Sequence, residues 1–212
     1  MLKKSGLYVV IDKELCVNKN ISSVTKAILD GGADIIQLRD KISSTREALK
    51  DAFIVKRIAD DYSAKFIVNN EVDIAFACDC DGVHLGQDDL PIEYARRILG
   101  EDKIIGLSAT NFNEAVKAQG DGADYIGLGP IFYTATKKDA GYPVGLNCLR
   151  RVTSAVKIPV VPIGGIAGVN IAKVASAGAK WAAVSSAVLK DGDIRNSTKT
   201  MKAMLRRACK NG

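Results

Sequence analysis

The chain has 212 residues, which is enough for one substantial core and too few for two comfortable domains. Apolar residues make up 47% and charged residues 25%, so disorder is excluded, and no apolar run is long enough to span a membrane. The net charge of +6 is spread along the chain and aromatic residues make up only 6%, which argues against nucleic-acid binding and suits small anionic substrates.

The N-terminal residues run directly into a strand-like segment, without a small-residue cleavage site behind it. The five cysteines are odd in number, and the single histidine offers little to a metal site built on imidazole. We therefore expect a cytoplasmic protein with reduced thiols and no membrane or nucleic-acid partner. The sequence leaves the oligomeric state open, a homo-oligomer included.

One phrase recurs along the chain with variation. Gly32-Ala33-Asp34-Ile35-Ile36 is echoed by Gly122-Ala123-Asp124-Tyr125-Ile126, and looser copies begin at Asp81 and Gly178. Each copy places a glycine, which suits the end of a helix, before an apolar stretch typical of a strand buried on both faces. In chain order, the predicted strands are Leu7–Ile11, Asp34–Leu38, Lys65–Asn69, Gly82–Leu85, Ile104–Ser108, Tyr125–Leu128, Pro159–Ile163 and Trp181–Ser185.

Amphipathic segments separate these strands. The clearest are Ser44–Tyr62 and Asn113–Gly120, and a final helix is predicted at Ser197–Cys209. Ser43 or Ser44, followed by Glu47, has the spacing of a capping box at the start of the first of these helices.

Strands that alternate with helices predict a parallel sheet. Eight such units in so short a chain predict a closed, single-domain (β/α)8 TIM barrel over residues 1–212. A doubly wound open sheet is the alternative, but its glycine fingerprint should follow the first strand, where this chain has Asp12-Lys13-Glu14-Leu15.

In such a barrel, the residues that directly follow the strands line the active face. After the second strand, alternation places Gln37, Arg39 and Lys41 on one side, where an amide and two cations can meet an anion. After the third strand, Asn69 and Asn70 either begin a turn or present amide groups to a ligand or a metal.

After the fourth strand, Asp88 and Asp89 place adjacent carboxylates at the rim. Magnesium prefers oxygen ligands and often uses one or two carboxylates together with phosphate oxygens of the substrate. Ser108 ends the fifth strand as a lone hydroxyl. An acid–base role for His84 stays open, but a packed, hydrogen-bonded barrel residue is the favoured interpretation.

The segment from Gly129 to Asp139 is long for a loop in so short a barrel chain, and long loops are often functional. Thr134 and Thr136 supply hydroxyl groups there, and Lys137 supplies a cation. We expect Tyr133–Asp139 to close over the site and to exclude water.

The loops after the seventh and eighth strands commonly form a phosphate site in this fold. Here Gly164-Gly165 ends the seventh strand, and Ser185-Ser186 ends the eighth. We therefore predict two anion sites: a diphosphate site with Arg39, Lys41, Lys137 and a metal at Asp89, and a monophosphate site around Gly165, Ser185 and Ser186.

Four motifs together resemble the thiamine-phosphate synthase family: Gln37–Lys41, Asp81–Asp89, Gly127–Lys137 with its Thr-x-Thr-Lys ending, and Ile163–Ile166. The resemblance extends from about Tyr8 to Val188, nearly the whole chain. It implies a transferase of thiamine biosynthesis that joins an aminopyrimidine diphosphate to a thiazole phosphate and releases pyrophosphate, with Mg2+ as cofactor.

Matched motif by motif, the resemblance also implies roles for single residues. The candidate catalytic residues are Arg39, Lys41, Lys137 and Ser108. The pyrimidine diphosphate would bind Gln37, Leu38, Arg39, Asp40, Lys41, Asn69, Ser108 and Lys137; the thiazole phosphate would bind Thr134, Ala135, Thr136, Gly165, Ser185 and Ser186; and magnesium would bind Asn70 and Asp89. The family often has Asp at the position of Asn70, so weaker metal binding is expected there, with Asp89 dominant.

Two other functions compete with this one. A thiazole tautomerase on a similar barrel would bind the thiazole phosphate without needing Arg39, Lys41, Asp89 and Lys137. A non-catalytic sensor of phosphorylated ligands would bind without turnover. The sequence does not say whether the thiazole substrate carries an additional carboxylate.

Overall fold

The computed structural model describes residues 4–136 and 141–210 of the chain. Its strands are β1 (Gly6–Asp12), β2 (Ile35–Arg39), β3 (Lys65–Asn69), β4 (Gly82–Leu85), β5 (Ile104–Ala109), β6 (Tyr125–Leu128), β7 (Val160–Pro162) and β8 (Trp181–Val184). Its helices are η1 (Lys13–Cys16, a 3-10 helix), α1 (Ile21–Asp30), α2 (Thr45–Asp60), α3 (Val72–Ala77), α4 (Ile92–Leu99), α5 (Phe112–Gly120), α6 (Gly145–Ala155), α7 (Ile171–Ser176), α8 (Ser186–Leu189) and α9 (Ile194–Lys210).

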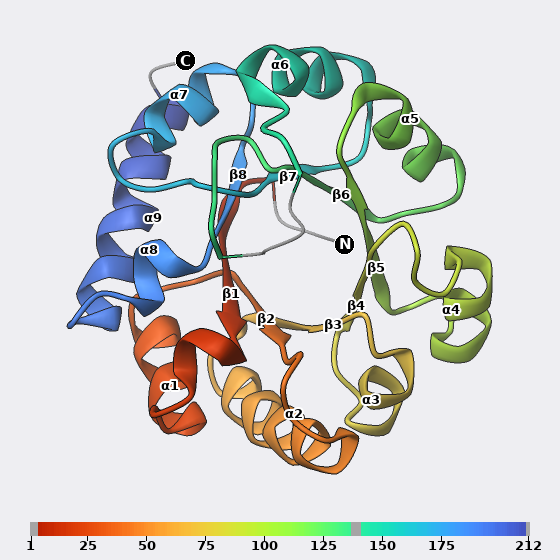
Figure 1. Cartoon of the computed structure of the whole chain (residues 1–212), viewed down its shortest axis with the longest axis vertical. Helices are drawn as coiled ribbons and strands as arrows, with labels where there is room; N and C mark the ends of the chain where they lie inside the picture. The colour runs from red at the N-terminus through yellow and green to blue at the C-terminus, as the bar shows by residue number, and fades with distance from the viewer. Residues whose placement is uncertain (1–3, 137–140, 211–212) are drawn as a thin grey trace.

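The eight strands are parallel and form one sheet in the order β7-β6-β5-β4-β3-β2-β1-β8. β1 pairs with both β2 and β8, and β7 lies in contact with β8 to complete a nearly closed barrel inside a ring of helices (Figure 1). The predicted (β/α)8 barrel is confirmed and the open doubly wound sheet is wrong. In the two described ranges, no helix has both the length and the apolarity needed to cross a membrane.

The predicted strands agree with the observed ones to within a residue or two at their ends. The final helix begins at Ile194 rather than at Ser197. The capping box belongs to Ser44: its hydroxyl accepts from the Glu47 N–H at 3.4 Å, and the Glu47 carboxylate accepts from the Ser44 N–H at 3.1 Å.

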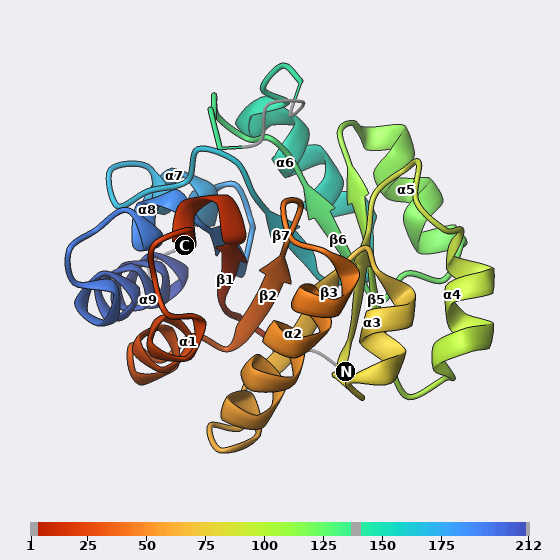
Figure 2. The same ribbon diagram turned by 60° about the horizontal axis from the view of Figure 1, so that its bottom comes forward.

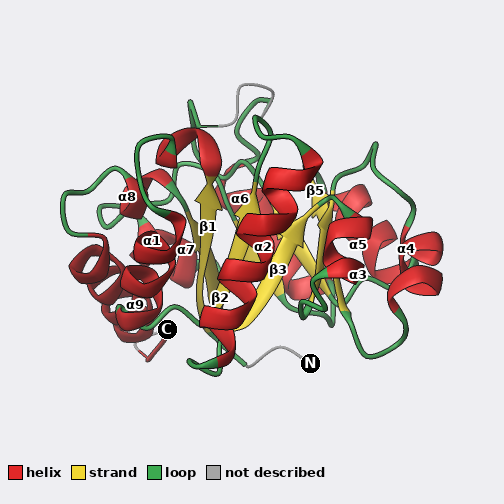
Figure 3. Cartoon of the chain, turned by 90° about the horizontal axis from the view of Figure 1, so that it is seen from below, coloured by secondary structure: helices red, strands yellow, loops and turns green. Residues whose placement is uncertain are grey.

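The strands lie inside a surrounding layer of helices (Figure 3), and alternation along the strands divides the apolar residues into two layers. On β1, Leu7 and Val9 face the helices and belong to the larger layer, whereas Tyr8 and Val10 face the barrel interior. The inner layer also contains Tyr125 and Trp181, and both are almost fully buried. Polar side chains that follow the same inward alternation at the strand ends therefore reach the mouth of the barrel.

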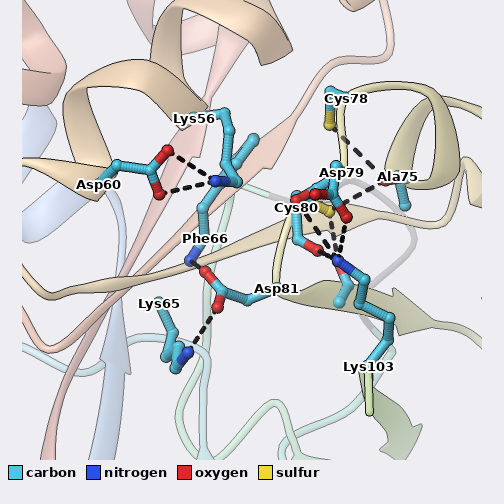
Figure 4. A network of polar contacts seen from close by, with 11 residues as sticks. Lys56, Asp60, Lys65, Phe66, Ala75, Cys78, Asp79, Cys80, Asp81 and Lys103 are labelled. Carbon is cyan, nitrogen blue, oxygen red and sulfur yellow. Dashed lines mark hydrogen bonds and ion pairs between the residues drawn. The ribbon is translucent and has the colours of Figure 1, made fainter. Parts of the chain in front are cut away.

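The recurring Asp of the sequence phrase stabilises the opposite end of the barrel. Asp34, Asp81 and Asp124 stand just before β2, β4 and β6. Each carboxylate accepts the backbone N–H of the second residue of the preceding strand, at 3.0 Å for Leu7, 2.9 Å for Phe66 and 2.8 Å for Ile105. Each also pairs with a cation, as Figure 4 shows for Asp81 and Lys65. The repeat therefore fastens neighbouring strands together.

Asp34→Ala should lower the free energy of unfolding by about 1–3 kcal/mol, because it leaves the Leu7 N–H without its carboxylate acceptor. Lys202, whose ammonium lies 3.2 Å from the same carboxylate, loses its ion pair as well. Urea unfolding measures the change. The control Asp102→Ala removes the same charge from an exposed loop residue and should change stability by less than about 0.5 kcal/mol. An equal loss in both variants would contradict this role of the repeat.

Candidate functional site

A cavity of about 570 Å³ opens at the carboxyl ends of the strands. The arrowheads of β2 and β6 point to this side of the barrel, where the segment after β6 also lies (Figure 2). Among the residues predicted for the site, the cavity wall contains Gln37, Arg39, Lys41, Asn69, Asn70, Asp89, Ser108, Thr134, Thr136, Gly165, Ser185 and Ser186. Residues from seven strand ends are thus brought to one cavity, as expected for this fold.

Four of the predicted residues are not placed in this wall. Leu38 is 3% exposed and packs between the sheet and the helices, because alternation turns it away from its neighbours on β2. Asp40 accepts the N–H groups of Ile42 at 3.1 Å and Ser43 at 2.9 Å, so it shapes its own loop. Ala135 stands between two wall residues without joining the wall. Lys137 lies outside the described residues.

Arg39 is held by a carboxylate that the sequence interpretation missed. Asp12 ends β1 directly opposite Arg39 in the ladder with β2, and the guanidinium Nη1 lies 2.8 Å from its Oδ2. Asp12 is 3% exposed. Burial raises the pKa of its carboxyl group, and the positive charge of Arg39 opposes that rise. Only the strand register places Asp12 beside Arg39, and no sequence spacing indicates it.

Lys41, Asn70 and Asp89 form a second polar cluster at the rim. The Lys41 ammonium donates to Asn70 Oδ1 at 2.6 Å, and Asn70 Nδ2 donates to Asp89 Oδ1 at 2.8 Å. The Gly86 N–H donates to the other oxygen of Asp89 at 2.6 Å. Asn70 has a φ of 54°, in the left-handed region that asparagine tolerates better than most residues. The structure thus brings these three side chains together at the rim.

The other side of the cavity carries small and hydroxyl residues. The Ser185 hydroxyl is buried and, within the part of the chain that the structure describes, has no hydrogen-bond partner. Gly165 has a φ of 63°, and a Cβ there would lie 2.8 Å from the Cβ of Phe132. The glycine is therefore needed for packing against the segment after β6, and not only for the approach of a ligand. A buried hydroxyl without a partner suits an anion that would accept from it.

The floor of the cavity is a chain of polar side chains across the barrel. Tyr8 and Tyr125 are almost fully buried, and their hydroxyl oxygens lie 2.9 Å apart. His84 contacts Tyr125 through Nδ1 at 2.9 Å and Ser108 through Nε2 at 3.0 Å, so the hydrogen-bonded placement favoured from the sequence is confirmed. His84 nevertheless also faces the cavity. The sequence interpretation missed both tyrosines, which read as ordinary strand residues.

Within the described ranges, no group of three or more His, Cys, Asp and Glu side chains gathers in a way that could hold a metal ion. The candidate metal ligands are therefore the oxygens of Asn70 and Asp89, with Asp88 also in the cavity wall. Any metal ion there would need further ligands from water or from a bound anion.

Comparison with known proteins gives consistent results. A family model described as thiamine monophosphate synthase matches residues 7–188. The chain is 47% identical to a thiamine-phosphate synthase of Methanosarcina barkeri, over 99% of this chain and 94% of the relative, and 43% identical to one of Clostridium novyi, over 92% and 96%. A solved structure of thiamine phosphate pyrophosphorylase from Pyrococcus furiosus superposes with a TM-score of 0.89 at 39% identity, covering 97% of each chain.

Ser185→Ala tests the anion site, with inorganic phosphate as the probe. Without phosphate, the free energy of unfolding should change by less than about 0.5 kcal/mol, because the hydroxyl has no partner in the described part of the protein. A hydrogen bond to a charged group contributes about 1.5–3 kcal/mol, so the Kd for phosphate should rise about tenfold or more.

Urea unfolding with and without phosphate gives both quantities. The control Ser154→Ala makes the same change on the exposed face of α6, where the hydroxyl donates to the Arg150 carbonyl, and should leave the Kd unchanged. The anion site is assigned incorrectly if Ser185→Ala binds phosphate as tightly as the wild type.

Proposed function

The chain belongs to the thiamine monophosphate synthase family, whose members are transferases of thiamine biosynthesis, and on that premise we propose the reaction of its cavity. The cavity joins 4-amino-2-methyl-5-pyrimidinylmethyl diphosphate to a thiazole phosphate, forms thiamine phosphate and releases pyrophosphate. The single observation that carries this proposal is the convergence of Arg39, Lys41 and Asp89 in one cavity with the Ser185 hydroxyl, which has no hydrogen-bond partner among the described residues.

The diphosphate belongs on the side of Arg39 and Lys41. A diphosphate carries more negative charge than a monophosphate, and this is the side of the described wall where two cations lie. Gln37, Asn69 and Ser108 add amide and hydroxyl groups that can orient the pyrimidine. The thiazole phosphate belongs on the side of Gly165, Ser185 and Ser186, together with Thr134 and Thr136.

The reaction needs charge stabilisation more than proton transfer. The bond between the pyrimidine methylene carbon and the diphosphate oxygen breaks, and its electron pair leaves with pyrophosphate. Arg39 and Lys41 stabilise that developing charge, an effect that usually dominates catalysis of this kind. The thiazole nitrogen then forms the new bond to the methylene carbon with its own electron pair. It carries no proton, so no side chain has to act as a general base.

The oxygens of Asn70 and Asp89 fit a magnesium ion. Their side chains are joined by a hydrogen bond of 2.8 Å, and two oxygen donors leave positions open for phosphate oxygens and water, which is the arrangement that Mg2+ prefers. Magnesium, when bound, would supply positive charge next to the diphosphate. Lys41 holds the Asn70 oxygen in the ligand-free site, so it would have to move aside for that oxygen to reach a metal.

The proposal also covers Lys137, the cellular location and the oligomeric state. Lys137 adds a third cation to the diphosphate site and lies outside the described residues. The protein works in the cytoplasm on small-molecule substrates. A homo-oligomer is compatible with this function.

Incubation with both substrates and magnesium tests the function directly. The expected result is a product with the mass of thiamine phosphate and one pyrophosphate released per product. Arg39→Ala should lower kcat/KM for the diphosphate about 100-fold to 1000-fold, the usual loss for a group that stabilises developing charge. The control Arg97→Ala removes the same charge from the exposed side of α4 and should keep full activity.

Two outcomes would overturn the assignment. Isomerisation of the thiazole phosphate without release of pyrophosphate would identify a tautomerase. Binding of both compounds without any product would identify a sensor.

The role of Arg39 has its own test. Retention of full activity by Arg39→Ala would remove that residue from the diphosphate site.

Asn70→Asp should tighten magnesium binding at least several-fold, because a carboxylate adds negative charge beside Asp89. Calorimetric titration of wild type and variant with Mg2+ in the presence of pyrophosphate measures the difference. The control Asn111→Asp makes the same change at the start of α5, far along the sequence from both ligands, where an aspartate also caps a helix. Equal metal affinity in wild type and Asn70→Asp would refute the assigned ligand pair.

A further inference from the structure

A single run of hydrogen bonds crosses the barrel interior beneath the cavity, from β2 to β5. Gln37 Nε2 donates to the Tyr8 hydroxyl at 2.7 Å, and the Tyr8 and Tyr125 hydroxyl oxygens lie 2.9 Å apart. Tyr125 contacts His84 Nδ1 at 2.9 Å, and His84 Nε2 contacts Ser108 Oγ at 3.0 Å. Five side chains from five different strands are therefore linked, and all five also belong to the cavity wall.

The orientation of the Gln37 amide sets the direction of this chain. The Gln37 amide nitrogen has only protons to give, so the Tyr8 oxygen accepts and must place its own proton elsewhere. Burial raises the pKa of Tyr8 and that of Tyr125, so both phenols keep their protons at neutral pH. The Tyr8 proton then goes to the Tyr125 oxygen, and the Tyr125 proton goes to Nδ1 of His84.

A neutral imidazole that accepts at Nδ1 carries its proton on Nε2. His84 therefore donates from Nε2 to the Ser108 oxygen. Since Ser108 already accepts that bond, its own hydroxyl proton is left to donate, and Ser108 lies in the cavity wall. The tautomer of a histidine beneath the site thus decides whether Ser108 offers a ligand a proton or a lone pair.

We propose that Tyr8 and Tyr125 are positioning residues, which hold His84 as the Nε2-protonated tautomer and so turn the Ser108 hydroxyl proton towards an acceptor atom of the bound diphosphate substrate. The identity of that substrate rests on the function proposed above. The tautomer itself does not, because it is a property of the ligand-free protein.

Packing holds the imidazole ring in the orientation that the chain requires. The ring stacks on Tyr125, with centroids 5.4 Å apart and planes inclined by 28°. On the neighbouring part of β6, a Cβ at Gly127 would lie 2.7 Å from Cε1 of His84. The ring therefore fills space that only a glycine leaves open, and a half turn about its Cβ–Cγ bond would put carbon atoms where Nδ1 contacts Tyr125 and Nε2 contacts Ser108.

The opposite direction of donation along this chain predicts the other tautomer of His84. If the Gln37 amide were turned over, its oxygen would accept from Tyr8, and every proton in the chain would shift one step. His84 would then carry its proton on Nδ1, and the Ser108 proton would point at Nε2 instead of at the ligand. A doubly protonated imidazole would donate to Tyr125 and leave one of the two tyrosine protons without an acceptor in this chain.

The chain contains one histidine, so uniform labelling of histidine with 15N gives one pair of ring nitrogens and a spectrum without overlap. In the ligand-free wild type at neutral pH, Nε2 should resonate as a protonated nitrogen and Nδ1 as an unprotonated one. Tyr125→Phe removes the donor to Nδ1 and should shift the population towards the other tautomer. The control Tyr62→Phe removes a hydroxyl that donates to Asp30 on the exterior and should leave both resonances unchanged.

A kinetic comparison then tests the link to Ser108. If Tyr125 acts through Ser108, the double variant Tyr125→Phe/Ser108→Ala should lose no more kcat/KM for the pyrimidine diphosphate than Ser108→Ala alone. The proposal is overturned by a wild type with the proton on Nδ1 or on both nitrogens, which needs no variant to fold. It is also overturned by an unchanged tautomer in Tyr125→Phe, or by losses that add in the double variant. None of the spectroscopic outcomes depends on which reaction the cavity performs.

Discussion

The parallel direction of all eight strands is the constraint on which the site depends. Because every strand ends on the same face, residues that are distant in sequence meet there, and alternation decides which of them face inward. Gln37, Arg39 and Lys41 reach the cavity for this reason, whereas Leu38 between them is buried against the helices. At the opposite face, Asp34, Asp81 and Asp124 fasten the strands that hold this arrangement.

In the ligand-free structure, the two described cations of the rim, Arg39 and Lys41, each contact a protein side chain, and the two partners differ. Arg39 pairs with the buried carboxylate of Asp12, which compensates the positive charge of Arg39 while no ligand is bound. Lys41 is held by the neutral amide of Asn70, which orients the ammonium without cancelling its charge. Arg39, which is preorganised in this way, loses little free energy to reorganisation when charge develops on a leaving group. An asparagine at position 70 therefore orients Lys41 by a hydrogen bond. As a neutral amide, it brings no negative charge to a metal ion, which an aspartate would.

The sequence predicts the strands well because their apolar runs are short, regular and separated by glycines, and it predicts the wall residues that follow from alternation. It does not predict Asp12 or the two tyrosines, because their partners are set by strand register and by packing across the barrel. The repeated Asp is visible as a phrase, but its role appears only when the preceding strand lies beside it. Asp40 and Ala135 belong to the motifs that carry the resemblance. In the structure, however, the Asp40 side chain accepts hydrogen bonds within its own loop, and Ala135 does not belong to the cavity wall.

The position of pyrophosphate in a crystal grown with magnesium tests most directly whether the rim cations receive the leaving group. We predict pyrophosphate in contact with Arg39 and Lys41, with the metal ion bound to Asp89 and to phosphate oxygens. Pyrophosphate bound only at Ser185 and Ser186, with Arg39 still paired to Asp12 alone and Lys41 still on Asn70, would contradict the assignment of the diphosphate site.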